Sequence, residues 1–141
     1  MMNILKVLTP KRVIGNLGER RAARFLRHNG YRILERNYVA EGHEIDIIAK
    51  KRDVLSFIEV KTRSLTSIGI KEARPASSVT PEKQRKIIKA ASRYIKPKHN
   101  GLKKRFDIIE VYVDSSGKKT KVTEIRHLEN AFNINTAYGR K

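Results

Sequence analysis

Two short segments of the chain carry acidic and basic side chains at a spacing that suits phosphodiester chemistry. The first segment is Glu44-Ile45-Asp46, and the second is Glu59-Val60-Lys61. Both have the composition of strands, and successive side chains of a strand point to opposite faces of the sheet. We therefore expect Glu44 and Asp46 on one face, with Ile45 and Ile47 on the other. By the same rule, Glu59 and Lys61 share a face of the second segment.

The two segments can pair as a hairpin that sets two carboxylates side by side. If Arg52 and Asp53 form a two-residue turn, Asp46 lies opposite Glu59. Like charges directly opposite each other destabilise a hairpin, so a sequence needs a reason to keep this pair, and a divalent cation is a good one. Mg²⁺ takes oxygen ligands from one or two carboxylates, with water and phosphate at its other positions. Such an ion can bind a scissile phosphate and lower the pKa of a bound water, while Lys61 orients the water or offsets phosphate charge.

The composition of the chain favours a cation site over an ordinary solvent-exposed strand. The 141 residues include 32 Lys and Arg but only 14 Asp and Glu, which gives a formal net charge of +18. An exposed strand often carries Glu and Lys on its solvent face, so Glu59 and Lys61 alone would mean little. The few acidic residues nevertheless concentrate in and beside this hairpin, at Glu41, Glu44, Asp46 and Glu59.

The charge and the absence of cysteine narrow the class of protein. A large positive charge favours a polyanionic partner, with an anionic membrane surface as the second choice. The chain has no Cys, which excludes disulfides, Cys-ligated zinc and thiol catalysis. No apolar run approaches the ~18 residues of a membrane span, and Lys6 and Pro10 interrupt the apolar N-terminal segment. We expect a cytoplasmic protein with no membrane association.

The elements that must position these residues alternate between helix and strand. A first helix is expected from Asn16 to Gly30, with Asn16 as N-cap and Glu19 at the capping-box position. Strands are expected over residues 31–39, 43–49, 54–62, 105–113 and 121–128. Residues 64–79 form a long polar loop. A second helix then begins at Pro81, capped by Thr80.

The second helix divides into a buried and a solvent-exposed side. The buried side is expected to carry Ile87, Ile88, Ala91, Tyr94 and Ile95, and the solvent side Lys83, Arg85, Lys86, Lys89, Arg93 and Lys96. The order of elements predicts an α/β fold with a mixed sheet of about five strands and flanking helices. We expect an N-terminal extension over residues 1–14, one domain over residues 15–132 and a flexible tail over residues 133–141.

Several short motifs support this interpretation when they are taken together. They are Gly18-Glu19 with Ala22-Ala23, Glu44-Ile45-Asp46, Phe57-Ile58-Glu59-Val60-Lys61-Thr62-Arg63, Lys83-Gln84-Arg85 and Arg105-Phe106-Asp107. In this combination the chain resembles the bacterial YraN-like family, within the PD-(D/E)xK superfamily of metal-dependent nucleases. The resemblance runs from about Gly15 to about Leu128 and implies a restriction endonuclease-like core. Ile45 is a departure, because it stands where the superfamily's name has proline.

The resemblance also implies roles for individual residues. By position, Asp46 and Glu59 match the metal-binding carboxylates and Lys61 the catalytic lysine, with Mg²⁺ or Mn²⁺ as the implied cofactor. Glu19 matches an acidic residue that completes the metal site, although its capping-box position explains it equally well. Gln84 matches a polar residue directed into the same site, and the alternative is a hydrogen bond to a loop backbone.

Nucleic acid is the expected partner, and DNA is favoured over RNA. The expected nucleic-acid contacts are Arg63, Lys83, Gln84 and Arg85. We expect a nuclease acting on DNA, with branched or single-stranded forms among its candidate substrates. A homodimer is a further expectation, because resolvase-like relatives work as dimers. Two alternatives stay open: a nucleic-acid-binding module without turnover, and a basic adaptor in a DNA repair or processing complex.

Overall fold

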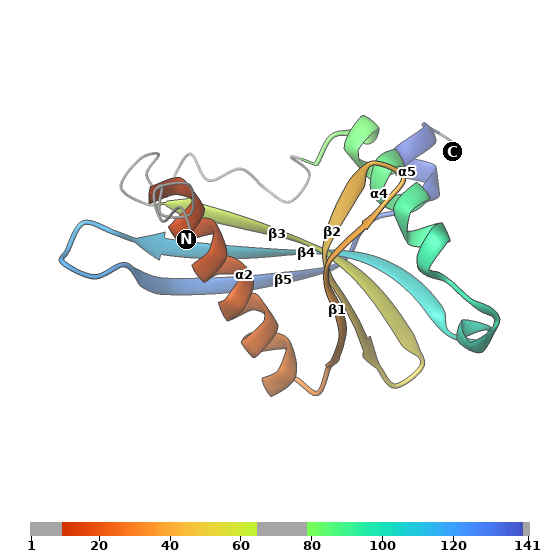
Figure 1. The fold of residues 1–141 in the computed structure, drawn as a ribbon, viewed down its shortest axis with the longest axis horizontal. Helices are drawn as coiled ribbons and strands as arrows, with labels where there is room; N and C mark the ends of the chain where they lie inside the picture. Colours follow the sequence, from red (N-terminus) through yellow and green to blue (C-terminus); the bar gives the residue numbers. More distant parts are fainter. Residues whose placement is uncertain (1–9, 65–78, 140–141) are drawn as a thin grey trace, which may run out of the picture.

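The computed structural model describes residues 10–64 and 79–139 and contains one five-stranded sheet with flanking helices (Figure 1). The elements in chain order are α2 (Pro10–His28), β1 (Arg32–Ala40), β2 (His43–Lys51), β3 (Val54–Ser64), α4 (Pro81–Tyr94), the 3-10 helix η3 (Pro97–His99), β4 (Lys103–Asp114), β5 (Lys121–Phe132) and α5 (Ile134–Tyr138). The sheet order is β1-β2-β3-β4-β5. β3 and β4 are parallel and the other neighbours are antiparallel. The predicted α/β fold with a mixed, restriction endonuclease-like sheet is confirmed.

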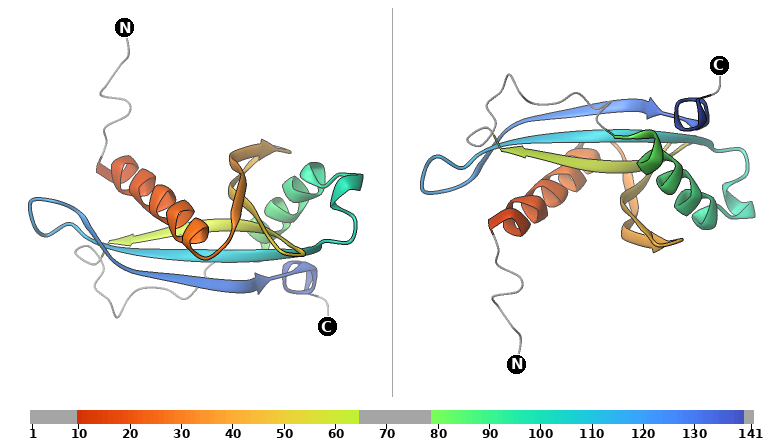
Figure 2. Two further views of the ribbon diagram at one scale, coloured as in Figure 1. Left: turned by 90° about the horizontal axis from the view of Figure 1, so that it is seen from below. Right: turned by 90° about the horizontal axis from the view of Figure 1, so that it is seen from above.

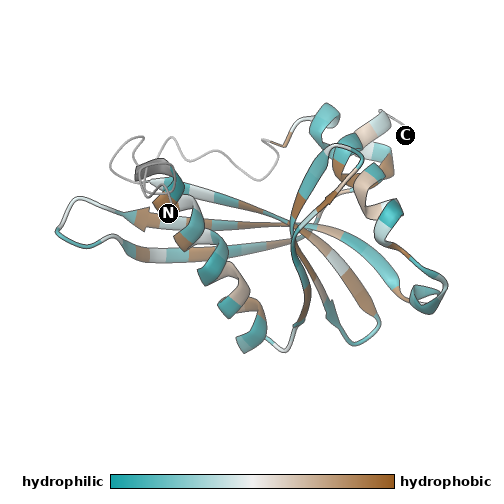
Figure 3. Ribbon diagram, in the orientation of Figure 1, coloured by the Kyte–Doolittle hydropathy of each residue, from teal (hydrophilic) through white to brown (hydrophobic). Residues whose placement is uncertain are grey.

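Two hydrophobic cores lie on opposite faces of this sheet. The α2 core consists of Ala22, Ala23, Leu26, Tyr31, Ile47, Ala49, Ile58, Ile109, Val111 and Val113. The α4 core consists of Ile45, Ile48, Leu55, Phe57, Val79, Ile87, Ala90, Ala91, Phe106, Ile108 and Phe132. Each helix contributes one apolar side to its core, and in Figure 3 hydrophobic and hydrophilic residues alternate along α2. β1 and β2 rise out of the plane of the other strands between α2 and α4 (Figure 2), so this pair of strands lies between the two helices.

The β2–β3 hairpin has the predicted register, and it ends one pair before the two carboxylates. Residues 52 and 53 form the turn, and the paired positions run from Lys51 and Val54 to Ile47 and Ile58. Beyond that point the side chain of Asp46 accepts a hydrogen bond from the Val60 backbone amide at 2.7 Å. A side chain therefore replaces the backbone ladder where the strands separate.

The expectation that Ile45 and Ile47 share a face is wrong. Ile45 belongs to the α4 core, whereas Ile47 belongs to the α2 core. Their side chains diverge because β2 leaves β3 at Asp46 and the regular alternation of the strand is lost at this residue. Asp46 is therefore bonded toward β3 itself rather than standing on one face of a flat sheet.

The first helix begins earlier than predicted. α2 starts at Pro10, so residues 10–14 belong to the helix and the expected extension is shorter, with residues 1–9 outside the described part of the chain. Proline suits the first position of a helix, where no amide donor is needed. Asn16 and Glu19 lie inside the helix, which rules out their predicted capping roles. Gly30, with φ at 87°, follows the end of the helix as expected.

The segment expected to be a flexible tail contains α5 instead. The Asn133 side chain caps this helix by accepting from the Thr136 amide at 3.1 Å, and the Thr136 hydroxyl accepts from the Asn133 amide at 2.9 Å. Ala137 is fully buried. These local bonds and one buried side chain hold residues 133–139 in place without a long apolar segment.

The remaining predictions on organisation concern the loop and the membrane. Residues 65–78 of the predicted polar loop lie outside the described residues. In the described ranges, residues 10–64 and 79–139, no helix is long and apolar enough to cross a membrane.

Candidate active site

Asp46 occupies the point where β2 and β3 separate. Its side chain is half-buried, and one of its oxygens accepts the Val60 amide hydrogen at 2.7 Å. Burial, followed by the negative charge of Glu59, raises the pKa of Asp46 to about 8, and the charge of Glu19 adds to this effect. Burial opposes ionisation because a charged carboxylate loses its hydration. Burial and the neighbouring carboxylates therefore both disfavour the ionised form of Asp46.

Glu59 is the buried centre of the site. It is 6% exposed, and its Oε2 atom forms an ion pair with Lys83 of α4. Lys61 Nζ lies 3.8 Å from the same oxygen. The structure thus brings together Asp46, Glu59 and Lys61, as the sequence predicted, and adds Lys83 from the helix that packs beside them.

The two lysines at Glu59 have different protonation behaviour. Burial, followed by the positive charge of Lys83, lowers the pKa of Lys61. Burial also disfavours the charged form of Lys83, but its hydrogen bond to Glu59 and the charge of that carboxylate outweigh burial and raise the pKa. Lys83 is therefore the fixed counter-charge of Glu59, and Lys61 is the amine that gives up a proton more easily.

The prediction that Lys83 lies on the solvent side of α4 is wrong. Thr80 is the N-cap of α4, and its hydroxyl accepts a hydrogen bond from the Lys83 amide at 3.1 Å. This cap fixes the first turn so that the Lys83 side chain reaches the buried Glu59. The side chain remains 36% exposed, and periodicity alone marks such a residue as a surface cation.

Glu19 stands at the rim of the site on α2. Its Oε1 atom accepts from Asn37 Nδ2 at 2.9 Å, and the same nitrogen donates to Glu44 Oε1 at 3.1 Å. A polar cavity of about 460 Å³ adjoins these groups and is lined by Arg12, Gly15, Asn16, Glu19, Asn37 and Glu44. Asn37 has φ at 53°, a left-handed conformation in which asparagine is enriched. Its role as a bridge between two carboxylates was not predicted, and the only signal for it is that residue type.

His43 also faces this group of charges. Burial lowers its pKa despite the opposing charge of Glu59, and the charges of Lys83 and Lys86 lower it further. Its Nε2 atom is buried and has no hydrogen-bond partner among the described residues. His43 is therefore a neutral imidazole at the α4 side of the site.

Two of the predicted nucleic-acid contacts hold the C-terminal helix instead. Gln84 donates to the Val79 carbonyl at 2.9 Å and accepts from the Thr136 hydroxyl at 2.8 Å. Arg85 donates to the Ala137 carbonyl at 2.6 Å. The backbone-bonding alternative therefore describes Gln84, whose two amide ends are occupied away from Glu59. Arg63, the fourth predicted contact, is half-buried near the end of β3.

Arg105 and Asp107, at the start of β4, belong to a separate buried network. Asp107 is fully buried and accepts hydrogen bonds from Arg105 at 2.9 Å and from the Asn130 amide at 2.9 Å. His127 Nε2 lies 2.8 Å from the same carboxylate. Burial alone would raise the pKa of Asp107, but its bonds to His127, Arg105 and Asn130 hold it below its usual range. This carboxylate is a structural ion and not part of the site.

The donor atoms of the site fit a hard divalent cation. In the part of the chain that the structure describes, no three acidic or histidine side chains converge into a preformed metal cage. Mg²⁺ and Mn²⁺ are nevertheless bound in many sites through one or two carboxylates, with water and phosphate as the other ligands. Asp46 and Glu59 supply such a pair, and Lys83 supplies the positive charge that now balances Glu59.

Comparisons with known proteins cover the whole site. A family model described as "Uncharacterised protein family UPF0102" matches residues 18–111. A UPF0102 protein of Chlorobaculum parvum is 48% identical over 121 residues, 84% of this chain and 91% of the relative. One from Acetivibrio thermocellus is 41% identical over 124 residues, 86% and 92% of the two chains. One from Dictyoglomus thermophilum is 46% identical over 120 residues, 84% and 96% of the two chains. The region matched by the family model begins at Gly18 and runs through the hairpin and α4 into β4.

Proposed function

This chain belongs to the YraN-like family UPF0102, and we propose that it is a metal-dependent nuclease that hydrolyses phosphodiester bonds in DNA. One observation carries the proposal. Asp46 and Glu59 lie where β2 and β3 separate, and Lys61 lies beside Glu59. An acidic pair with a neighbouring amine, in a protein of net charge +18, suits a polyanionic substrate. The phosphate of such a substrate needs a cation between it and the carboxylates in order to approach them.

The residues would divide the work of hydrolysis. Asp46 and Glu59 would hold Mg²⁺ or Mn²⁺, with Glu19 at the rim as a further oxygen donor, and the ion when bound supplies charge for the phosphate and acidity for a water. Lys61 would orient the attacking water and offset charge on the phosphate. The water oxygen would bond to phosphorus while losing a proton to bulk solvent, the ester bond opposite it would break, and the leaving oxygen would take a proton from solvent.

A second candidate is a nucleic-acid-binding module without turnover. The ion pair between Lys83 and Glu59 favours it, because a permanent ammonium on this carboxylate would balance the buried charge with no metal. In that case the acidic pair stabilises the strand junction, and only the basic surface contacts DNA. An adaptor that binds a protein partner is the third possibility, and weak, salt-insensitive DNA binding would indicate it.

A cleavage assay with matched variants tests the proposal. Labelled linear duplex, single-stranded and four-way-junction DNA are incubated with the protein in Mg²⁺, Mn²⁺ or EDTA. Asp46→Asn, Glu59→Gln and Lys61→Ala are run beside Glu82→Gln, which removes an exposed carboxylate on α4. We expect metal-dependent cleavage in the wild type and the Glu82 variant, and a loss of about a hundredfold or more in the three site variants.

The outcomes separate the candidates. Cleavage that persists in all three site variants would refute the assigned roles and indicate a contaminating enzyme. Undiminished DNA binding in wild type and variants, with no cleavage in either metal, would replace the nuclease by the binding module.

A further inference from the structure

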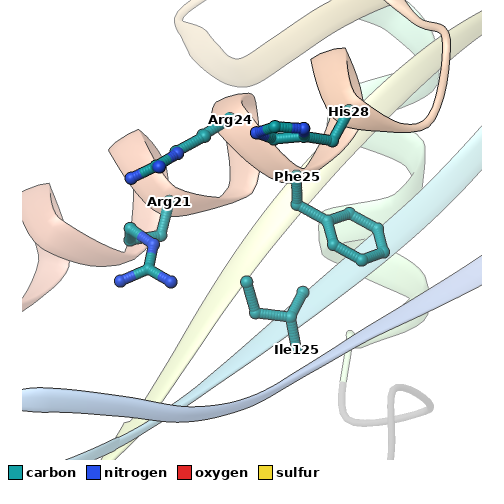
Figure 4. Close-up of a pocket in the computed structure, with 5 residues that line it drawn as sticks. All are labelled: Arg21, Arg24, Phe25, His28 and Ile125. Atoms are coloured by element: carbon teal, nitrogen blue, oxygen red, sulfur yellow. The ribbon is translucent and has the colours of Figure 1, made fainter.

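A second cavity lies between α2 and β5, apart from the candidate active site (Figure 4). It has a volume of about 400 Å³ and is lined by Arg21, Arg24, Phe25, His28 and Ile125. Cavities of roughly 300–1,000 Å³ are typical of small-ligand sites. Phe25 and Ile125 pack against the α2 core and form an apolar floor. In Figure 4 the two guanidinium groups and the imidazole lie around this floor on the α2 side.

The basic side chains of this α2–β5 cavity are not neutralised by the described part of the protein. Arg21, Arg24 and His28 form no ion pair with any residue in the described ranges. Glu124, the acidic neighbour of Ile125 in β5, pairs with Arg126 at 2.6 Å instead. Because side chains alternate along a strand, Glu124 and Ile125 face opposite sides of the sheet. The cavity therefore presents two guanidinium groups with no carboxylate beside them among the described residues.

The cavity and the candidate active site lie on opposite edges of the same helix. On one edge of α2, Glu19 bonds to Asn37 of β1. On the other edge, the ring of Phe25 contacts the ring of His127 in β5, with centroids 6.3 Å apart. A strand of nucleic acid that crosses α2 can therefore reach both places, whereas a single small ligand cannot.

We propose that the α2–β5 cavity binds one nucleotide of a DNA strand, at a distance from the linkage in the candidate active site. Arg21 and Arg24 hold its phosphate, because planar guanidinium groups match phosphate oxygens in geometry and charge. Phe25 and Ile125 hold the base, since bases bind apolar and aromatic surfaces with little regard to sequence. An inorganic phosphate or an acidic peptide would interact with the two guanidinium groups but would not contact the apolar floor. The proposal rests on DNA being the ligand of the proposed function.

Equilibrium binding in EDTA, where no metal-dependent cleavage occurs, tests whether Arg21 and Arg24 bind phosphate. The probe is a fluorescein-labelled single-stranded DNA of about 20 nucleotides, measured by anisotropy at several salt concentrations. We expect Arg21→Ala/Arg24→Ala to weaken binding about tenfold and to lower the slope of log affinity against log salt by about 1.4, or ~0.7 for each lost phosphate contact. Lys98→Ala/Lys103→Ala removes the same charge from the η3 end of the molecule and is the matched control.

Crosslinking tests the location directly. The chain contains no cysteine, so His28→Cys introduces a single thiol at the cavity and Lys98→Cys a single thiol at the control position. Each is incubated with the same oligonucleotide carrying an activated disulfide on an internal base. We expect a mixed disulfide at position 28 and little at position 98, with competition by unmodified DNA.

The results distinguish this proposal from the nuclease proposal. Equal losses of affinity in the two double variants, or equal crosslinking at positions 28 and 98, would overturn the cavity assignment whether or not the protein cleaves DNA. Selective crosslinking at position 28 without cleavage in any metal would uphold the cavity while refuting the nuclease.

Discussion

Replacing Gly18 by alanine should move α2 away from β3 and disturb the site from a distance. A Cβ atom built on Gly18 would collide with the Thr62 hydroxyl oxygen and lie 3.0 Å from the Thr62 Cβ atom. Ordinary contacts begin near 3.4 Å, so the helix and the strand must separate or the side chain must be forced out of place. Overpacking of this kind costs about 1–3 kcal/mol. Glu19, the next residue, would move with the helix.

Gly15 provides a matched control on the same helix. A Cβ atom at Gly15 meets nothing within 4 Å, so alanine there only reduces the conformational freedom of the unfolded chain. We expect Gly15→Ala to raise the free energy of unfolding by about 0.5–1 kcal/mol. Gly18→Ala should lower it, so the same chemical change has opposite signs three residues apart.

Urea unfolding measures both variants, and a double-mutant cycle tests the cause. Thr62→Ala removes the hydroxyl and methyl groups nearest to the new Cβ atom. The double variant Gly18→Ala/Thr62→Ala should therefore recover part of the loss, with a coupling of about 0.5–3 kcal/mol. If Gly18→Ala were as stable as Gly15→Ala, or if Thr62→Ala gave no recovery, the close packing of α2 on β3 would not limit this position.

Two further variants probe the charged groups. Lys83→Met removes the ammonium that a metal must displace from Glu59. A charged hydrogen bond contributes about 1.5–3 kcal/mol, so the variant should bind Mn²⁺ about tenfold more tightly than the wild type when affinity is measured by calorimetry. Asp107→Asn should lower the free energy of unfolding near neutral pH by about 3–5 kcal/mol, because it leaves Arg105 without its buried partner. The pKa of Asp107 is lowered in the folded state, so its stabilisation is present above the ordinary carboxyl pKa and is lost as pH falls through the lowered value.

Each of these results has a control and a contrary outcome. Lys86→Met removes an exposed lysine of α4 that pairs with Glu82 and should leave Mn²⁺ affinity unchanged; weaker binding in Lys83→Met would show that this amine assists the metal. For Asp107→Asn, the difference from wild type in urea unfolding should shrink as the pH is lowered. A difference that stayed constant into strong acid would mean that the carboxylate charge does not matter.

The sequence predicted the hairpin register because the determining interactions are local. Arg52 and Asp53 mark a two-residue turn, and the ladder follows residue by residue to Ile47 and Ile58. It did not predict that Ile45 and Ile47 face different cores. That change depends on the bond between Asp46 and the Val60 amide, a contact across the sheet that strand alternation does not describe.

The errors at the two helices also have tertiary causes. Gly15 lies directly before the predicted start at Asn16 but is inside α2, and Gly18, already inside the predicted helix, is required by the approach of Thr62 from β3. Lys83 fits a solvent-exposed position by periodicity, and only its distance to a buried carboxylate of another element shows otherwise. Local capping was predictable at Thr80, where the hydroxyl and the following proline act within one turn.

The five-residue helix α5 gives the end of the chain an influence on the centre of the molecule. A helix this short does not persist alone in water. Two residues near the start of α4 stabilise it: Arg85 donates to the Ala137 carbonyl, and Gln84 accepts from the Thr136 hydroxyl. Proteolysis before Ile134, or a protein that bound residues 134–138, would remove the partners of Gln84 and Arg85, which follow Lys83 on α4. The α5 helix is therefore coupled to the end of α4 that supplies the positive charge beside Glu59.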